Sequence, residues 1–184
     1  MLRRAYMVML TLAVLFAAGL GAPRQANAYS PEIEGNVDAT LRQFYSQVYS
    51  GRELAKKASA VLVFPNVVKA GFGIGGSYGE GALRIGGRTA GYYNTASASI
   101  GFQIGAQGRS VVILFMTKSA LRNFRARDGW EIGVDGSVVL ITVGAGAEVD
   151  TNNIVDPIIG FMFNNKGLMY NLTLEGSKIS RIDR

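Results

Sequence analysis

The hydrophobic pattern predicts two helices at the front of the chain. Residues 37–48 place apolar side chains at helical spacing and polar ones opposite, which is typical of an amphipathic helix of about three turns. The preceding Ser30-Pro31-Glu32 is a helix-start signal, because a capping residue is followed by proline and an acid. Gly51 ends this helix, and residues 53–60 predict a second one. Both helices are expected to pack on a sheet. A lipid surface is the alternative for their apolar faces.

A glycine-rich stretch from Phe64 to Gly105 follows. Glycines alternate there with single large apolar residues at period two, which indicates strands rather than helices. Glycine on one face of a strand lets another backbone approach closely or lets the strand bend sharply. We interpret this stretch as the tightly curved part of a small β-structure, with turns at residues 79–81 and 86–87.

The remaining pattern predicts further short strands and one helix. The expected strands are a buried strand over 61–64 that Pro65 ends, a strand over 97–107, a strand over 111–116 covered on both faces, a hairpin of 130–134 with 137–143 across Asp135-Gly136, a second hairpin of 158–163 with 168–174 across residues 164–167, and a last strand over 178–182. Ser119 caps the short helix, which ends at Arg125, and residues 145–156 read as a loop. The fold class is α+β. We expect a single antiparallel β-rich domain, a curved sheet or barrel-like sandwich, with N-terminal helices and one short mid-chain helix.

Residues 1–28 have the features of a secretory signal peptide. Arg3 and Arg4 precede a short apolar run, and Ala26-Asn27-Ala28 forms a small-x-small cleavage site. We therefore expect an exported, periplasmic or membrane-associated envelope protein with one domain over residues 29–184. A retained membrane anchor is the alternative, although the apolar run is short for a spanning helix.

The composition argues against several functional classes. The chain has no histidine and no cysteine, so His-based and Cys-based nucleophilic triads are unavailable and no disulfide can form. The glycines of residues 71–76 match a dinucleotide-binding loop in spacing, but the residues after them are poor helix formers. The acids of residues 150–156 lack the glycine and glutamate of a calcium loop. We expect no catalysis, no cofactor and no metal.

Basic residues gather in two places. Arg122, Arg125 and Arg127 form one cluster, and Lys69, Arg84 and Arg88 are expected beside the glycine-rich strands. A solvated face explains the first, with anionic lipid head groups as the functional alternative. Removing residues 1–28 removes three arginines and no acid, so the net charge falls from +6 to +3. This modest charge, without a compact basic-aromatic motif, disfavours nucleic acid as a partner.

Several segments together resemble the SYLF lipid-binding domain family. They are Ala60–Phe72, Gly75–Gly81, Ser99–Gln107 with the apolar run after it, Asn165–Leu168 and Leu174–Ser177. The resemblance covers roughly residues 35–182. It implies a lipid-binding module, associated in eukaryotic members with phosphoinositide membranes and, in yeast actin-patch proteins, with actin. A Trp-Ser-x-Pro segment that members often carry is replaced here by residues 88–93. We carry over lipid binding, but neither phosphoinositides nor actin.

The resulting functional hypothesis is non-catalytic, peripheral binding of anionic phospholipid. The resemblance places the lipid surface on the N-terminal amphipathic helix and nearby basic residues. The predicted contacts are Phe44 and Val48 for the apolar part, and Lys56, Lys57, Lys69, Arg84 and Arg88 for head groups. The alternative is an envelope structural or protein-interaction module, related to actin-binding domains, that docks an envelope protein without touching lipid.

Overall fold

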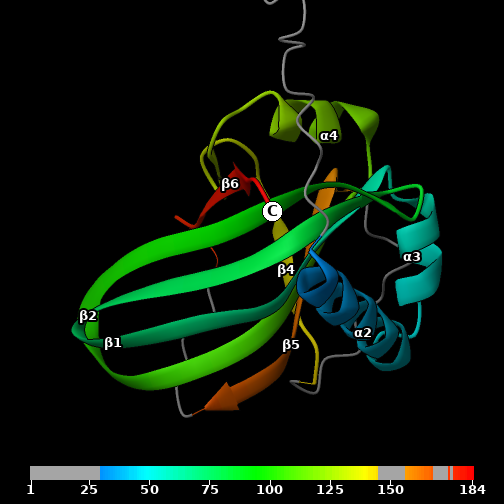
Figure 1. Cartoon of the computed structure of the whole chain (residues 1–184). Helices are drawn as coiled ribbons and strands as arrows, with labels where there is room; N and C mark the ends of the chain where they lie inside the picture. Colours follow the sequence, from blue (N-terminus) through cyan, green and yellow to red (C-terminus); the bar gives the residue numbers. More distant parts are fainter. Residues whose placement is uncertain (1–29, 145–155, 168–173, 175) are drawn as a thin grey trace, which may run out of the picture.

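The computed structural model describes residues 30–144, 156–167, 174 and 176–184. Its elements, in chain order, are α2 (Pro31–Gln47), α3 (Gly51–Lys57), β1 (Ala60–Ile85), β2 (Arg88–Phe115), α4 (Lys118–Arg125), β3 (Trp130–Glu131), β4 (Val139–Thr142), β5 (Ile158–Gly167) and β6 (Lys178–Ile182). They form one curled, half-barrel sheet with helices packed on it (Figure 1), so the predicted α+β class with a curved sheet is confirmed. The predicted signal peptide, the loop after residue 144 and the strand 168–174 lie wholly or mostly outside the described residues.

Helix α2 begins where the sequence predicts. Ser30 is its N-cap residue and Pro31 occupies the first turn, where a missing backbone N–H costs nothing. Its apolar stripe packs on the sheet, because the ring of Phe44 lies 5.0 Å from that of Phe161 on β5. Gly51 starts α3 rather than only ending α2. Its position close to the Phe44 ring leaves little room for a side chain.

Strands β1 and β2 form one very long antiparallel ribbon, closed by a tight turn. Gly86 and Gly87 have φ of 57° and 78°, so the turn predicted there is confirmed. Two other sequence predictions are wrong. Pro65 does not end the strand, because a register shift between Phe64 and Val67 absorbs it. Residues 79–81 do not turn, because their glycines let β1 lie close against its own earlier half, where a Cβ on Gly81 would overlap the Val63 carbonyl oxygen.

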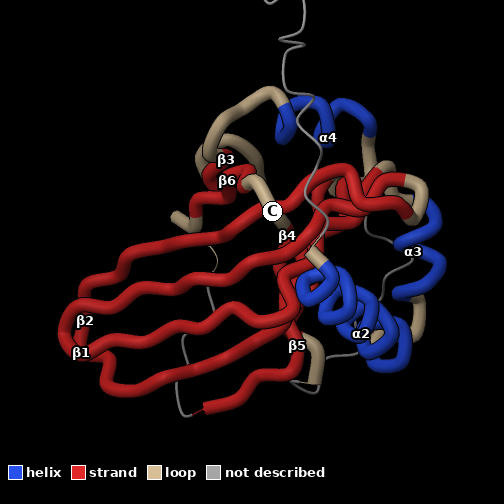
Figure 2. The backbone as a smooth tube through the Cα atoms, in the orientation of Figure 1, coloured by secondary structure: helices blue, strands red, loops and turns tan. Residues whose placement is uncertain are grey.

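The ribbon doubles back on itself. β1 and β2 bend together, with a register shift between Phe72 and Ile74, so that β1 lies inside the bend of β2 (Figures 1 and 2). The bend is tight because a Cβ on Gly71 would lie 2.5 Å from the Cα of Gly75. The bent end of the ribbon, which we call the tip, projects away from the helices (Figure 2). We call the opposite end, with the turn and both chain ends of the ribbon, the base.

The shorter strands extend the sheet from β2. The order is β3-β6-β2-β5-β4, with β1 paired to β2 on its other side. β6 was predicted correctly and pairs with Tyr92–Ala96 of β2. The hairpin predicted across Asp135-Gly136 is wrong. A turn forms there, but β3 pairs with β6 and β4 pairs in parallel with β5, so the two strands do not pair with each other.

The second predicted hairpin is also wrong at its turn. Residues 164–167 continue β5, which pairs with β2, and Asn164 takes a left-handed φ of 56° at a register shift instead of opening a turn. The polar character of this segment reflects a strand end near solvent, since Asn165 and Lys166 are exposed. The polar, glycine-containing residues 164–167 therefore form an irregular strand end and not a turn.

Two apolar clusters lie on opposite sides of the sheet. One joins α2 and α3 to the sheet, and the other joins α4 to it through Phe124 and Trp130. Residues 111–115 contribute alternately to both clusters, so the strand predicted to be covered on both faces is confirmed. Helix α4 begins two residues earlier than predicted, because its cap is Thr117 and not Ser119: the Thr117 side chain accepts the cap hydrogen bond from the Ala120 N–H.

Candidate functional site

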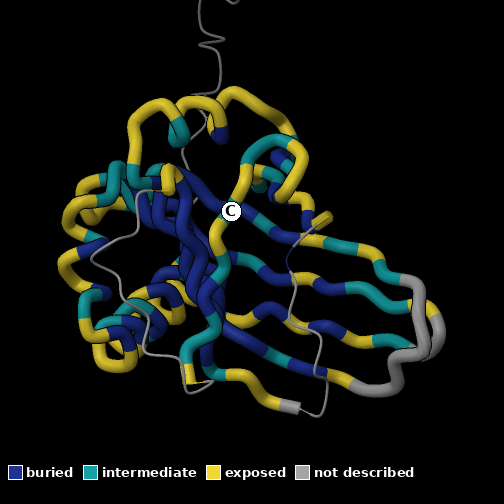
Figure 3. The backbone as a smooth tube through the Cα atoms, turned by 180° about the vertical axis from the view of Figure 1, so that it is seen from behind, coloured by how far each residue is buried: buried dark blue, intermediate teal, exposed yellow. Residues whose placement is uncertain are grey.

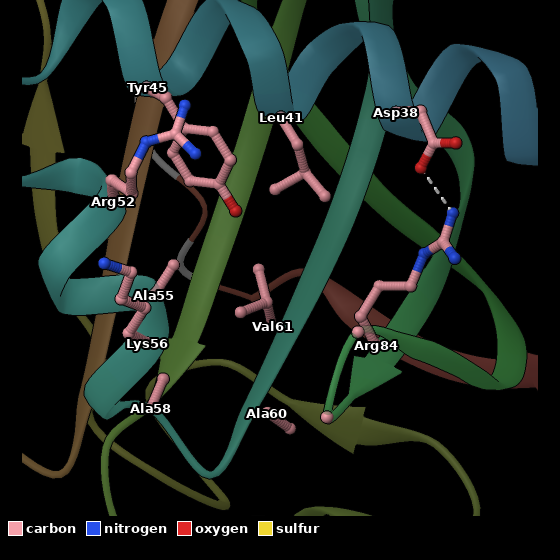
Figure 4. A pocket seen from close by; sticks show the side chains of 12 residues that line it. Asp38, Leu41, Tyr45, Arg52, Ala55, Lys56, Ala58, Ala60, Val61 and Arg84 are labelled. Carbon is pink, nitrogen blue, oxygen red and sulfur yellow. Dashed lines mark hydrogen bonds and ion pairs between the residues drawn. The ribbon is translucent and has the colours of Figure 1, made fainter.

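A pocket opens at the base, between α2, α3 and the end of β1 (Figure 4). Its volume is about 370 Å³. Its lining combines an apolar floor with charged residues: Asp38, Leu41, Tyr45, Arg52, Ala55, Lys56, Ala58, Ala60, Val61, Arg84, Gly86 and Gly87. The two glycines of the ribbon turn keep one wall free of side chains. The pocket thus joins three segments that are separate in the sequence.

Helix α3 supplies two of the three cations. Arg52 and Lys56 stand four residues apart, which places them on the same side of a helix. The Arg52 guanidinium lies 4.8 Å from the centre of the Tyr45 ring, a cation–π contact that orients it toward the pocket. Lys56 pairs with Glu53 at 2.9 Å, and both side chains are well exposed. The hydrogen bond from Lys56 is the largest cause of the lowered pKa of Glu53.

Arg84 is the third cation, and it is held by carboxylates of α2. Its guanidinium lies 2.7 Å from Glu34 and 2.7 Å from Asp38. Glu34 is buried and also accepts hydrogen bonds from the hydroxyls of Thr89 and Tyr92 at 2.7 Å each. This buried polar network clamps the N-terminal part of α2 onto both strands of the ribbon. Most of the charge of Arg84 is therefore compensated within the protein.

The structure gathers only part of the predicted lipid site. Lys56 and Arg84 line the pocket, while Lys57 and Arg88 are exposed close to it, one on α3 and one directly after the turn. Lys69 is elsewhere: it lies nine residues along β1 from Ala60, about 30 Å at the rise of a strand. It is also buried, at 7% exposure, opposite Gln107. Lys69 does not belong to this site.

The predicted apolar contacts need correction. Phe44 is 0% exposed and Val48 is 7% exposed, because both fill the apolar cluster between α2 and the sheet. The alternative left open for this helix is thereby decided in favour of packing on the sheet. Arg52 and Tyr45 also belong to the site but were not predicted from the sequence. The four-residue spacing of Arg52 and Lys56 was the available signal, but nothing in the sequence placed Tyr45 beneath them.

A second pocket in the described part of the chain, of about 420 Å³, has Glu32, Glu80 and Arg184 as its charged lining residues, and Arg184 is paired with Glu80, so it gathers no cluster of cations. No group of three or more acidic side chains in the described ranges could hold a metal ion. None of the described helices combines the length and the hydropathy needed to cross a bilayer. The pocket at the base therefore remains the main candidate site.

Comparison with known families identifies the C-terminal half. Residues 96–183 match the family model Ysc84, described as Las17-binding protein actin regulator. A comparison with curated proteins gave no match. The matched residues run from the first half of β2 to the end of β6, whereas the pocket lining lies between Asp38 and Gly87. The resemblance to the SYLF family is confirmed over residues 96–183, which match the model of the Ysc84, or SYLF, domain.

Proposed function

We propose that this protein is a non-catalytic domain that binds anionic phospholipid head groups at the pocket of the base. The observation that supports the proposal is the meeting of Arg52, Lys56 and Arg84 around an apolar floor in a pocket of about 370 Å³. That volume lies at the small end of the usual range for ligand pockets, about 300–1,000 Å³, and suits one head group better than a whole lipid.

The charge balance around the pocket favours an anionic ligand. Five cations lie at or beside it, namely Arg52, Lys56, Lys57, Arg84 and Arg88. Three carboxylates lie among them, of which Glu34 and Asp38 are bound to Arg84, and Glu53 to Lys56. Arg52, Lys57 and Arg88 are exposed and form no ion pair with a described acidic residue. These three are the cations best placed to attract an anionic surface, at roughly 1 kcal/mol each.

A protein partner is the second candidate. The description of the matched family names a protein that binds Las17 and regulates actin, and the match covers residues outside the pocket. A protein-docking module would therefore use the surface of residues 96–183, and substitution of the pocket cations would leave its partner binding unchanged. We expect an exported location, as the predicted signal peptide implies, so the partner would be an envelope protein.

The test is vesicle co-sedimentation of the chain that begins at Tyr29, with neutral and with anionic vesicles. The double variant Lys57→Gln/Arg88→Gln should lower affinity for anionic vesicles by about 30-fold, which corresponds to ~2 kcal/mol. Arg52→Gln should add a further loss. The matched control is Lys118→Gln/Arg122→Gln, which removes two exposed cations from α4. Equal losses of affinity in both double variants would show that net charge alone, and not the pocket, determines vesicle binding. Unchanged binding in the pocket variants would overturn the proposal.

A further inference from the structure

The tip of the ribbon is free of charge. Residues 70–79 of β1 and 95–108 of β2 contain no Asp, Glu, Lys or Arg. Together they make up the bent half of the ribbon, since Ala70 pairs with Ala106 and Tyr78 with Ala96. A solvent-exposed projection of this size ordinarily carries charges, because they keep β-edges from associating. Their absence from both strands needs a physical reason.

One face of the tip is exposed and apolar. Side chains alternate between the two faces of a strand, and Figure 3 shows this alternation of buried and exposed positions along the projecting strands. The exposed face carries Val68 at 43%, Ile74 at 74% and Tyr78 at 48% exposure, with exposed alanines around them at positions 70, 96, 98 and 106. No described residue of the helices covers this face, which the figures show apart from them.

We propose that the tip dips into the interfacial zone of a lipid bilayer, with Ile74 as its leading described side chain. Large exposed apolar patches mark interaction sites, and two features here favour a lipid surface as the occupant. The patch lies on a bend that projects from the rest of the fold, so a protein partner would need a matching hollow, whereas a bilayer conforms to the projection. The charge-free sequence also removes the main cost of entering an apolar medium.

The backbone and the flanking residues set the depth. β1 and β2 remain paired almost to the bend, with Phe72 opposite Ile104, so most of their backbone hydrogen bonds would survive in an apolar medium. Tyr78 is placed at the rim, where its hydroxyl donates to Glu80 at 2.6 Å, and tyrosine is typical of the membrane–water boundary. Along these strands, the charge-free segments are flanked directly by Lys69 and Arg109, which are both buried, and by Glu80, while Lys166 on β5 lies opposite Gly108. They limit insertion to a shallow contact of about 5–10 Å.

This inference rests on the proposed function only in that both require a lipid surface. The tip and the pocket lie at opposite ends of the ribbon, because β1 runs about 12 residues from Ala60 to the bend, or roughly 40 Å, and then returns to Ile85. One flat membrane therefore meets one end or the other. Binding at the pocket is electrostatic and binding at the tip is apolar, so salt separates them.

The absence of native cysteine allows a single label to report on the tip. An environment-sensitive fluorophore on Ile74→Cys should shift to the blue when zwitterionic vesicles are added in about 1 M salt, where electrostatic attraction is screened within ~3 Å. The same label on Ser119→Cys, exposed on α4, should not shift. Unlabelled Ile74→Ser should lose the salt-resistant part of vesicle binding while keeping the salt-sensitive part.

Each other result decides the matter. Salt-sensitive binding without any shift of the Ile74 label would overturn the tip contact and leave the pocket proposal standing. A blue shift that grows with protein concentration in the absence of vesicles would assign the tip to a second copy of the chain. A salt-resistant blue shift that substitutions in the pocket leave unchanged would support the membrane contact of the tip, even if the pocket binds no head group. No interaction with any vesicle would overturn both.

Discussion

The two ends of the β1–β2 ribbon are built on different principles. At the base, helices cover the sheet, apolar side chains fill two clusters, and a buried carboxylate with its arginine ties α2 to the strands. At the tip, the same two strands continue without charges, and their outer face is left exposed. Since both ends share one pair of strands, the difference comes from side chains and not from topology.

The comparison shows where stability and binding are expected to separate. Residues at the base have buried partners, so substitutions there act first on the free energy of unfolding. Exposed residues of the tip have few partners, so substitutions there should change binding without changing the fold. Matched substitutions at the two ends should therefore differ in whether they alter stability or binding.

The largest effect is expected for Gly81→Ala in the base half of β1. A Cβ at this position would overlap the Val63 carbonyl oxygen, and neither backbone segment can move without opening the ribbon. We expect a loss of more than about 4 kcal/mol in the free energy of unfolding, measured by urea denaturation. The tip counterpart Gly76→Ala meets only the Ser97 carbonyl oxygen at 3.0 Å and should cost far less. Similar losses in both variants would contradict the contrast.

The next effect is expected for Glu34→Ala. Removing this carboxylate leaves Arg84 without its buried partner and takes the acceptor from the Thr89 and Tyr92 hydroxyls. Breaking such a buried pair from one side costs about 3–5 kcal/mol. The control Asp38→Ala removes the other carboxylate of Arg84, whose side chain is 55% exposed, and should cost under about 1 kcal/mol. Equal costs would show that Glu34 does not hold α2.

A smaller effect concerns pH and the pair of Arg184 with Glu80, between base and tip. The hydrogen bond from Arg184, followed by the one from Tyr78, lowers the pKa of Glu80 from its ordinary value of 4.5. The folded state therefore gains stability above pH 4.5, and this gain is lost as the pH falls through the lower folded pKa. Glu80→Gln should flatten the pH dependence of the melting temperature in that range. An unchanged profile would show that this pair contributes nothing.

The smallest effect on stability is expected for Ile74→Ser at the tip. Its side chain is 74% exposed, so the free energy of unfolding should stay within about ±0.5 kcal/mol of wild type. Urea denaturation of the two proteins side by side gives this difference. A loss above 1 kcal/mol would mean that Ile74 packs against the fold and is not a free apolar contact.

Much of the fold follows from local patterns in the sequence. The helical spacing before Gly51, the strand 178–182 and the turn at Gly86-Gly87 were all predictable, because each has a local chemical signal. The glycines at 79 and 81 were misjudged as a turn, since a glycine needed for close backbone approach looks the same in sequence as one needed for φ above zero. The parallel pairing of β4 with β5 joins segments that are distant in the sequence, so the turn signal at Asp135-Gly136 could not predict it.

The candidate site was predictable only in part. Lys56 and Arg84 were identified as basic residues, but their meeting at one pocket depends on β1 returning to its starting end after a bend of the whole ribbon. Phe44 and Val48 were assigned to lipid because an amphipathic helix has the same pattern on a sheet as on a membrane. The apolar tip has a signal in the sequence, namely two long segments without charged residues. Only the fold shows that these segments pair with each other and are exposed.

The most direct test of the central claim is a salt titration of vesicle binding by the chain that begins at Tyr29. Binding to anionic vesicles should fall steeply as salt rises and then level off at a salt-resistant remainder. Lys57→Gln/Arg88→Gln should weaken the salt-sensitive part of the binding by about 30-fold, and Ile74→Ser should remove the salt-resistant remainder. Binding that is absent at every salt concentration, or that neither variant alters, would contradict a lipid-binding role for both ends of the ribbon.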